Sequence, residues 1–271
     1  MLRSARIGSL PARCLAALVG LCACGKDARA QQPPVDVKVE FVQAAAAKKQ
    51  ASTGSADVSN VAVWLTPLDT SPERAASTTA AKFVPKLVQR NKVFEPHMLV
   101  IHVGTVVQFP NKDPFFHNVF SLFDGKRFDL GLYEAGSAKS VRFDRPGVSS
   151  LFCNIHPQMS AVVVTVNTPY YGVSDAEGRI SIHDVPDGRY QLQVWSERST
   201  PDSLKLAERV ITISPTTREF GPIRILENPE FTLAHKNKYG QDYVLPSNPD
   251  YLPHYVLLSS DSVKLVCVSL P

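Results

Sequence analysis

A short segment near the middle of the chain carries three side chains that could bind a metal ion together. Cys153, His156 and Met159 follow one another at intervals of three residues, so a single turn can bring a thiolate, an imidazole and a thioether to one point. A second imidazole, that of His117, lies 36 positions upstream of Cys153 and must arrive from another segment. These ligand types suit both oxidation states of copper, with the methionine sulfur as a weak, more distant donor. The pattern therefore predicts one copper ion that can gain and lose an electron.

Two other kinds of metal site use similar residues, and the spacing argues against both. Structural zinc sites are built from paired cysteines and histidines and do not recruit methionine. A dinuclear copper centre would need a second cysteine in the loop, and the segment 153–159 contains only one. A lone buried cysteine or methionine is usually an ordinary core residue. The occurrence of all four candidate ligands in this order favours a shared metal site over an unrelated role for each of them.

The segment from Cys153 to Met159 resembles the copper-binding loop of the cupredoxins, and its C-x2-H-x2-M spacing is most similar to that of amicyanin-like members. In that family the upstream ligand is a histidine followed directly by asparagine, which His117 and Asn118 match. The resemblance implies that these two histidines, the cysteine and the methionine bind copper. It implies further that the Asn118 carboxamide ties its strand to the Cys153 loop, and that the solvent-side edge of His156 passes electrons to a partner.

Short β patterns surround these residues. Apolar runs at 98–103 and 105–109 meet at Gly104, another run spans 161–166, and no long amphipathic helix pattern interrupts them. The resemblance, which covers about residues 90–167, implies a Greek-key β-sandwich. The sequence therefore predicts an all-β fold for this part of the chain.

A second β pattern follows the first. Turn sequences at 175–178 and 184–188 separate expected strands at 179–183 and 189–195. A D-x-x-G turn followed by a V-P-x-G-x-Y segment resembles the carboxypeptidase regulatory-like, or transthyretin-like, β-sandwich. That resemblance implies a scaffold or interaction module rather than a catalytic domain.

The chain thus divides into four expected parts. They are a signal peptide at 1–30, a cupredoxin-like copper domain at 31–168, a second and smaller β-sandwich at 169–227, and an extended C-terminal tail at 228–271.

The first 30 residues have the features of an export signal. Three arginines precede a short apolar run at 15–25, and the small residues Ala28 and Ala30 precede a cleavage point at Gln31. The apolar run is too short to span a bilayer. An alternative is a lipoprotein signal that leaves Cys24 as a lipid-anchored terminus, although Cys22 is unusual in such a motif. We expect a protein that is periplasmic or otherwise exported, with no transmembrane span after signal removal.

Charge and cysteine content agree with export. The first 30 residues hold five basic residues and one acidic residue, which equals the whole net charge of +4, so the remainder is close to neutral. This balance gives no reason to expect nucleic acid as a partner. Cys153 and Cys267 are the cysteines that follow the signal. A disulfide between them is possible in an oxidising compartment, but it would consume the thiolate that copper needs, so we expect none.

Motifs for other activities are absent from the sequence. It contains no H-E-x-x-H zinc motif, no G-x-S-x-G nucleophile turn, no phosphate loop, and neither the His-x-His nor the His-Cys-His pattern of enzymes with additional coppers. We therefore expect no enzyme but a type 1 (blue) copper protein that carries single electrons by outer-sphere transfer between redox partner proteins. The alternative is a periplasmic copper-binding or envelope interaction protein without a shuttle role.

Overall fold

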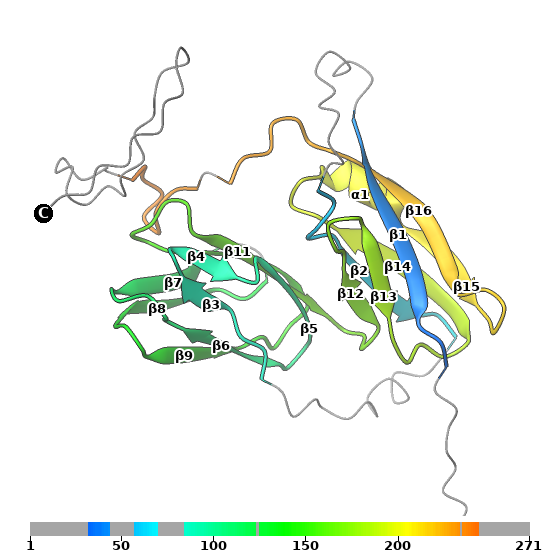
Figure 1. Cartoon of the computed structure of the whole chain (residues 1–271), viewed down its shortest axis with the longest axis horizontal. Coiled ribbons are helices and arrows are strands. Elements are labelled where there is room, and N and C mark those ends of the chain that lie inside the picture. Colours follow the sequence, from blue (N-terminus) through cyan, green and yellow to red (C-terminus); the bar gives the residue numbers. More distant parts are fainter. Residues whose placement is uncertain (1–31, 44–56, 70–83, 123–124, 234, 244–271) are drawn as a thin grey trace, which may run out of the picture. The chain divides into compact units, whose positions relative to one another are not determined.

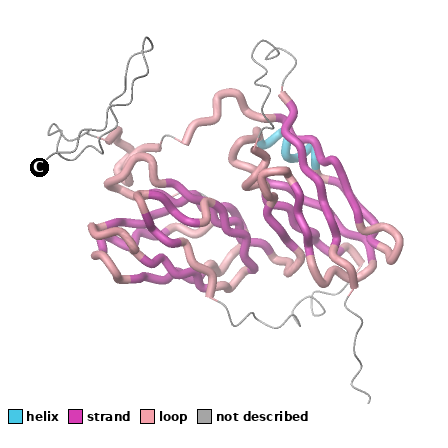
Figure 2. Tube along the Cα trace, in the orientation of Figure 1, coloured by secondary structure: helices cyan, strands magenta, loops and turns pink. Residues whose placement is uncertain are grey.

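The structure of the chain is a computed structural model that describes residues 32–43, 57–69, 84–122, 125–233 and 235–243. This described part is built from β-strands apart from one short helix, α1 (Pro201–Ala207), as Figures 1 and 2 show, which confirms the all-β class. None of its helices has the length and apolar character needed to cross a membrane. The expected export signal, the alternative anchor at Cys24 and the thiol of Cys267 lie outside the described residues.

The strands between residues 88 and 166 form the first sandwich. A five-stranded sheet has the order β5-β11-β10-β7-β8, and the pairs β6-β9 and β3-β4 complete the set. In chain order the strands are β3 (Val88–Arg90), β4 (Val93–Glu95), β5 (Met98–His102), β6 (Val106–Pro110), β7 (His117–Ser121), β8 (Phe128–Tyr133), β9 (Ala138–Arg142), β10 (Gly147–Phe152) and β11 (Ser160–Val166). The runs predicted on either side of Gly104 correspond to β5 and β6, and Gly104 itself has a φ of 89°.

The core of the first sandwich receives side chains from both the five-stranded sheet and the β6-β9 pair. Phe109 of β6, Leu151 of β10 and Val163 of β11 are fully buried in one hydrophobic cluster. Cys153 and Met159 belong to the same cluster. The segment predicted to bind a metal therefore starts and ends in the hydrophobic core, which fixes the two ends of the loop.

A second sandwich is formed by seven other strands, in two sheets of order β13-β1-β16 and β12-β2-β14-β15. In chain order these strands are β1 (Val35–Val42), β2 (Ala62–Pro67), β12 (Tyr171–Val173), β13 (Arg179–Ile182), β14 (Gly188–Trp195), β15 (Arg209–Ile213) and β16 (Glu219–Leu226). The strands expected at 179–183 and 189–195 correspond to β13 and β14. The turn between β12 and β13 is closed by Asp175, whose carboxylate accepts hydrogen bonds from the N–H groups of Glu177 and Arg179.

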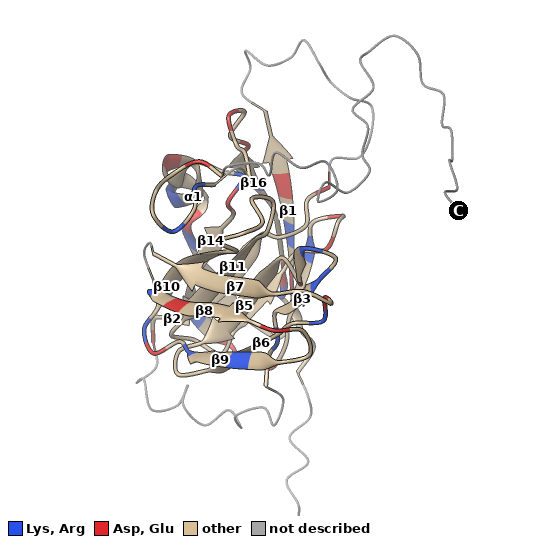
Figure 3. Ribbon diagram, turned by 90° about the vertical axis from the view of Figure 1, so that its left-hand side faces the viewer, with Lys and Arg blue, Asp and Glu red and all other residues tan. Residues whose placement is uncertain are grey.

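The strand pairing corrects the expected start of the copper domain at residue 31, whereas its expected end at 168 still falls between β11 and β12. Strands β1 and β2 lie within the range 31–168 assigned to the copper domain, yet both pair with strands of the second sandwich. Strand β1 buries Val35, Val37 and Val39, which alternate with acidic and basic residues. These charged residues are the red and blue segments of β1 in Figure 3. Such alternation identifies a half-buried strand but not the sheet that it joins, because the pairing partner is chosen by the whole fold.

We expect Leu151→Ala to lower the free energy of unfolding by about 2–5 kcal/mol, because it leaves a cavity in the core of the first sandwich. Leu132→Ala in β8 is the matched control, since Leu132 belongs to the same sheet but is 59% exposed. Denaturant unfolding followed by circular dichroism measures both changes. Equal midpoints for the two variants would contradict the described core.

Candidate metal centre

Neighbouring strands of the five-stranded sheet bring the predicted ligands together. His117 is the first residue of β7, and Cys153 directly follows the last residue of β10. The two strands are antiparallel neighbours, with Phe152 opposite Phe120. The first residue of β7 and the last residue of β10 therefore lie at the same end of the two strands. Although His117 and Cys153 are 36 positions apart in sequence, their side chains are close in space.

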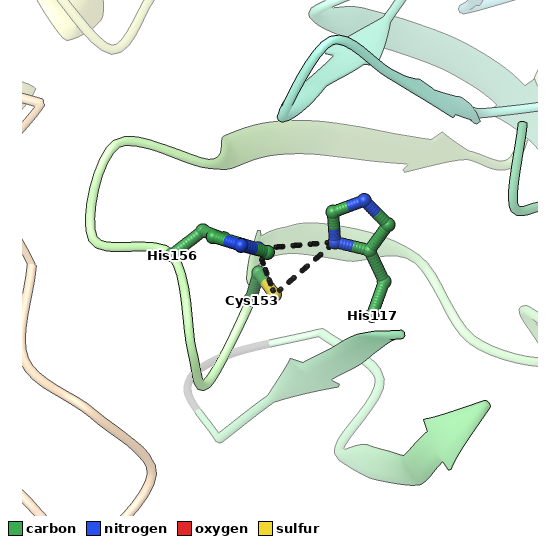
Figure 4. A group of neighbouring side chains, drawn as sticks. All are labelled: His117, Cys153 and His156. Atoms are coloured by element: carbon green, nitrogen blue, oxygen red, sulfur yellow. Dashed lines mark hydrogen bonds between the residues drawn. The ribbon is translucent and has the colours of Figure 1, made fainter. Parts of the chain in front are cut away.

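The side chains of His117, Cys153 and His156 point toward one another (Figure 4). The Sγ of Cys153 lies 3.8 Å from Nδ1 of His117 and 3.6 Å from Nδ1 of His156, and the two Nδ1 atoms are 3.1 Å apart. Nitrogen and sulfur ligands at metal bond lengths of 2.0–2.3 Å stand about 3.4–3.8 Å from one another. The triangle thus has about the size needed to surround a single ion.

Burial sets the protonation of these three groups. His117 and Cys153 are fully buried and His156 is partly exposed. Burial lowers the pKa of His117, lowers that of His156 to about 4, and raises the pKa of the Cys153 thiol. Both imidazoles are therefore neutral near pH 7 and keep a lone pair for a metal ion, while the thiol must lose its proton to become a ligand.

Backbone N–H groups surround the cysteine sulfur. Those of Asn118, Ile155 and His156 hydrogen-bond to it and lower the pKa of the Cys153 thiol, although burial has the larger and opposite effect. Such groups stabilise negative charge on sulfur. The pocket is therefore prepared for a thiolate once a cation compensates its charge.

Asp113 is a functional residue that the sequence analysis missed. Its Oδ2 lies 2.7 Å from Nε2 of His117, and it is 5% exposed. The same carboxylate accepts hydrogen bonds from the N–H groups of Asn91 and Lys92. A carboxylate on Nε2 keeps the proton on that nitrogen, so the lone pair of Nδ1 faces the other two donors. An acidic residue four positions before His117 was the available signal.

Asn118 has a different partner from the one expected. Its carboxamide Nδ2 donates a 2.7 Å hydrogen bond to Asp129 of β8, and its buried Oδ1 has no hydrogen-bond partner among the described residues. The expected tie from this carboxamide to the Cys153 loop is therefore wrong. The backbone of Asn118 makes that link instead, through its N–H to the cysteine sulfur. The side chain joins β7 to β8.

Met159 closes the ligand loop. Its N–H donates to the carbonyl oxygen of His156 over 3.1 Å, and its own carbonyl oxygen accepts from the N–H of Cys153 over 3.2 Å. The side chain is fully buried in the cluster that contains Cys153. These two hydrogen bonds make 153–159 a compact turn with limited freedom to move its donor atoms.

Aromatic and apolar side chains lie beside the imidazoles. The ring of Phe115 is 5.2 Å from that of His117 and 5.6 Å from that of His156, measured between centroids. Phe116 and Ile155 are exposed, at 56% and 43% respectively. Of the two phenylalanines before His117, Phe115 therefore packs against the site and Phe116 faces solvent.

Comparison with known proteins adds a limited likeness. No protein-family model and no curated protein matches the chain. A purple cupredoxin from Nitrosopumilus maritimus is 24% identical with a TM-score of 0.28, over 30% of this chain and 99% of that one. A mutant of amicyanin in its Cu(I) form is 21% identical with a TM-score of 0.29, over 30% and 80%. A copper-containing nitrite reductase from Thermus scotoductus SA-01 is 24% identical with a TM-score of 0.30, over 37% and 27%. The case for a metal site therefore rests on this chain's own residues.

We expect Asp113→Asn to weaken copper binding by about 10- to 100-fold, because the amide no longer fixes the tautomer and orientation of His117. Competition with a chelator of known affinity measures the change. Asp144→Asn serves as the control, since Asp144 pairs with Lys126 on the surface of the same sandwich. Unchanged affinity in Asp113→Asn would show that His117 does not depend on this carboxylate.

Proposed function

We propose that this chain is an exported type 1 copper protein that carries single electrons between redox partner proteins. The observation that carries the proposal is the buried triangle formed by one Sγ and two Nδ1 atoms, those of Cys153, His117 and His156. One thiolate and two imidazoles in a trigonal arrangement are the donors of blue-copper sites. In this proposal Met159, buried in the same loop, is the weak axial donor.

The donor set favours copper over zinc. Structural zinc sites close a tetrahedron with four nitrogen or sulfur ligands, whereas the described triangle has three such atoms and a thioether as its fourth candidate. Methionine sulfur is a soft donor, and soft sulfur ligands select copper.

A bound copper ion would supply one-electron redox chemistry, and the chain's own residues would keep its ligands in place. His117 is held by Asp113, and the loop is closed by the hydrogen bonds between Cys153, His156 and Met159. Because strands β7 and β10 are neighbours in one sheet, the backbone segments that carry His117 and Cys153 cannot move apart without breaking hydrogen bonds of that sheet. Ligands held in this way change position little between the two oxidation states. A small structural change is what rapid outer-sphere transfer requires.

His156 is proposed as the route to the partner. It is partly exposed, whereas His117 and Cys153 are fully buried. Phe116 and Ile155 expose apolar surface next to the ligands in sequence. A small apolar surface around one exposed imidazole edge suits a weak and short-lived contact with another protein. The export of the chain is the part of this proposal that rests on the sequence.

We expect purified protein to develop an intense visible thiolate-to-copper band when cupric salt is added, and Cys153→Ser to abolish that band. Met159→Leu should keep the band and raise the reduction potential, because the axial donor that stabilises the oxidised ion is lost. Visible and electron paramagnetic spectra with potentiometry measure these effects. His183→Gln is the control, since His183 is an exposed residue of the second sandwich.

Two results would count against the proposal in different ways. A band that survives in Cys153→Ser would refute the ligand assignment. A wild-type protein that binds copper with the expected spectrum but does not cycle reversibly between oxidation states would favour copper binding without a shuttle role.

A further inference from the structure

A segment that follows the last strand of the second sandwich contacts the ligand loop of the first sandwich. Residues 235–243, here called the strap, follow β16 and have no regular secondary structure (orange in Figure 1). The sequence analysis expected the tail from 228 onward to be extended. Instead, residues 237–241 of the strap form a turn, closed by the hydrogen bond from the N–H of Asn237 to the carbonyl oxygen of Gln241. His235 is half-buried and packs against Phe152, the residue that precedes Cys153.

The first attachment of the strap is to the backbone of Cys153. The hydroxyl of Tyr243 donates a 2.7 Å hydrogen bond to the carbonyl oxygen of Cys153 and lies 3.2 Å from Nδ1 of His235. The ring of His235 stacks on that of Phe152, with centroids 4.2 Å apart and an interplanar angle of 30°. The strap therefore contacts the backbone of Cys153 and the ring of Phe152, and not the Sγ of Cys153.

The second attachment joins the strap to both ligand-bearing segments. The N–H of Lys238 donates to Oδ1 of Asn154 in the ligand loop over 2.9 Å. Its Nζ lies 2.7 Å from Oδ2 of Asp129, whose Oδ1 accepts the hydrogen bond from Asn118 of β7. Through Lys238 the strap connects the loop that carries Cys153 and His156 with the strand that carries His117.

We propose that the strap is part of the metal centre, with Tyr243 and Lys238 as positioning residues that hold the Cys153 loop against β7. The inference rests on the proposed copper site. The hydrogen bond from Tyr243 to the carbonyl oxygen of Cys153 fixes the peptide plane that follows Cys153. A fixed peptide plane limits the positions that the Cys153 sulfur and the His156 ring can take. In this proposal, retention of the metal depends on the nine residues of the strap, which lie after β16 in the sequence. The strap contacts Phe152, Cys153, Asn154 and Asp129, and His156 is partly exposed.

The test compares two tyrosines of the strap in the full chain. Tyr243→Phe removes the hydroxyl that reaches Cys153, and Tyr239→Phe removes a hydroxyl from a residue that is 71% exposed. We expect Tyr243→Phe to release copper to a chelator about 10-fold faster than the wild type, the usual size of an outer-shell effect. Tyr239→Phe should release it at the wild-type rate. In metal-free protein, amide hydrogen exchange at 154–159 should be faster in Tyr243→Phe alone.

Lys238 gives an independent variant with its own control. Lys238→Met removes the ion pair with Asp129 and should also make copper release faster than in the wild type. Lys238→Arg keeps a positive charge at this position and should release copper at the slow wild-type rate. Lys236→Met changes an exposed lysine two residues away and should have no effect.

The outcomes separate this inference from the proposed function. If the wild type forms no thiolate-copper band, the proposed function is wrong, and hydrogen exchange in the metal-free protein still tests whether the strap holds the loop. If the wild type forms the band and both Tyr243→Phe and Lys238→Met release copper at its rate, the strap is not part of the centre.

Discussion

The rest of the first sandwich depends on one electrostatic constraint, the convergence of three electron-pair donors in a buried pocket. His117, Cys153 and His156 direct lone pairs at one another, and two of these residues have no exposure to water. Two imidazole nitrogens 3.1 Å apart repel each other through their lone pairs unless a proton or a cation lies between them. Asp113 maintains this arrangement, because it holds the proton of His117 on the nitrogen that points away. A cation at the centre would offset this repulsion, and for this reason we propose a metal site here rather than an ordinary polar cluster.

The sheet meets this constraint by providing a frame that cannot relax locally. His117 begins β7 and Cys153 follows β10, and these strands are hydrogen-bonded neighbours. The loop that carries the remaining donors starts and ends in the hydrophobic core, at Cys153 and Met159. To separate the donors the protein would have to break sheet hydrogen bonds and expose core side chains. The energy of folding is thus used to hold the ligands in one place.

Hydrogen bonds from distant segments surround the ligands and set their orientation. Asp113 acts on His117 from the preceding loop, and Asp129 of β8 connects Asn118 with Lys238. Tyr243 contacts the backbone of Cys153 from a segment 90 residues later in the chain. Outer contacts of this kind decide how firmly each ligand is held. If the proposed function is correct, retention of the metal is a property of the whole first sandwich and the strap together.

The sequence by itself determined the donor types, their spacing and the all-β class, because each of these is a local property. Alternation in a strand and the C-x2-H-x2-M interval are visible within a few residues. Only the tertiary structure decided that β1 and β2 join the second sandwich, that Asn118 bonds to Asp129, and that His235 stacks on Phe152. These choices depend on which surfaces meet when the whole chain is buried. The pattern of a single segment holds no information about a partner that lies far away in sequence.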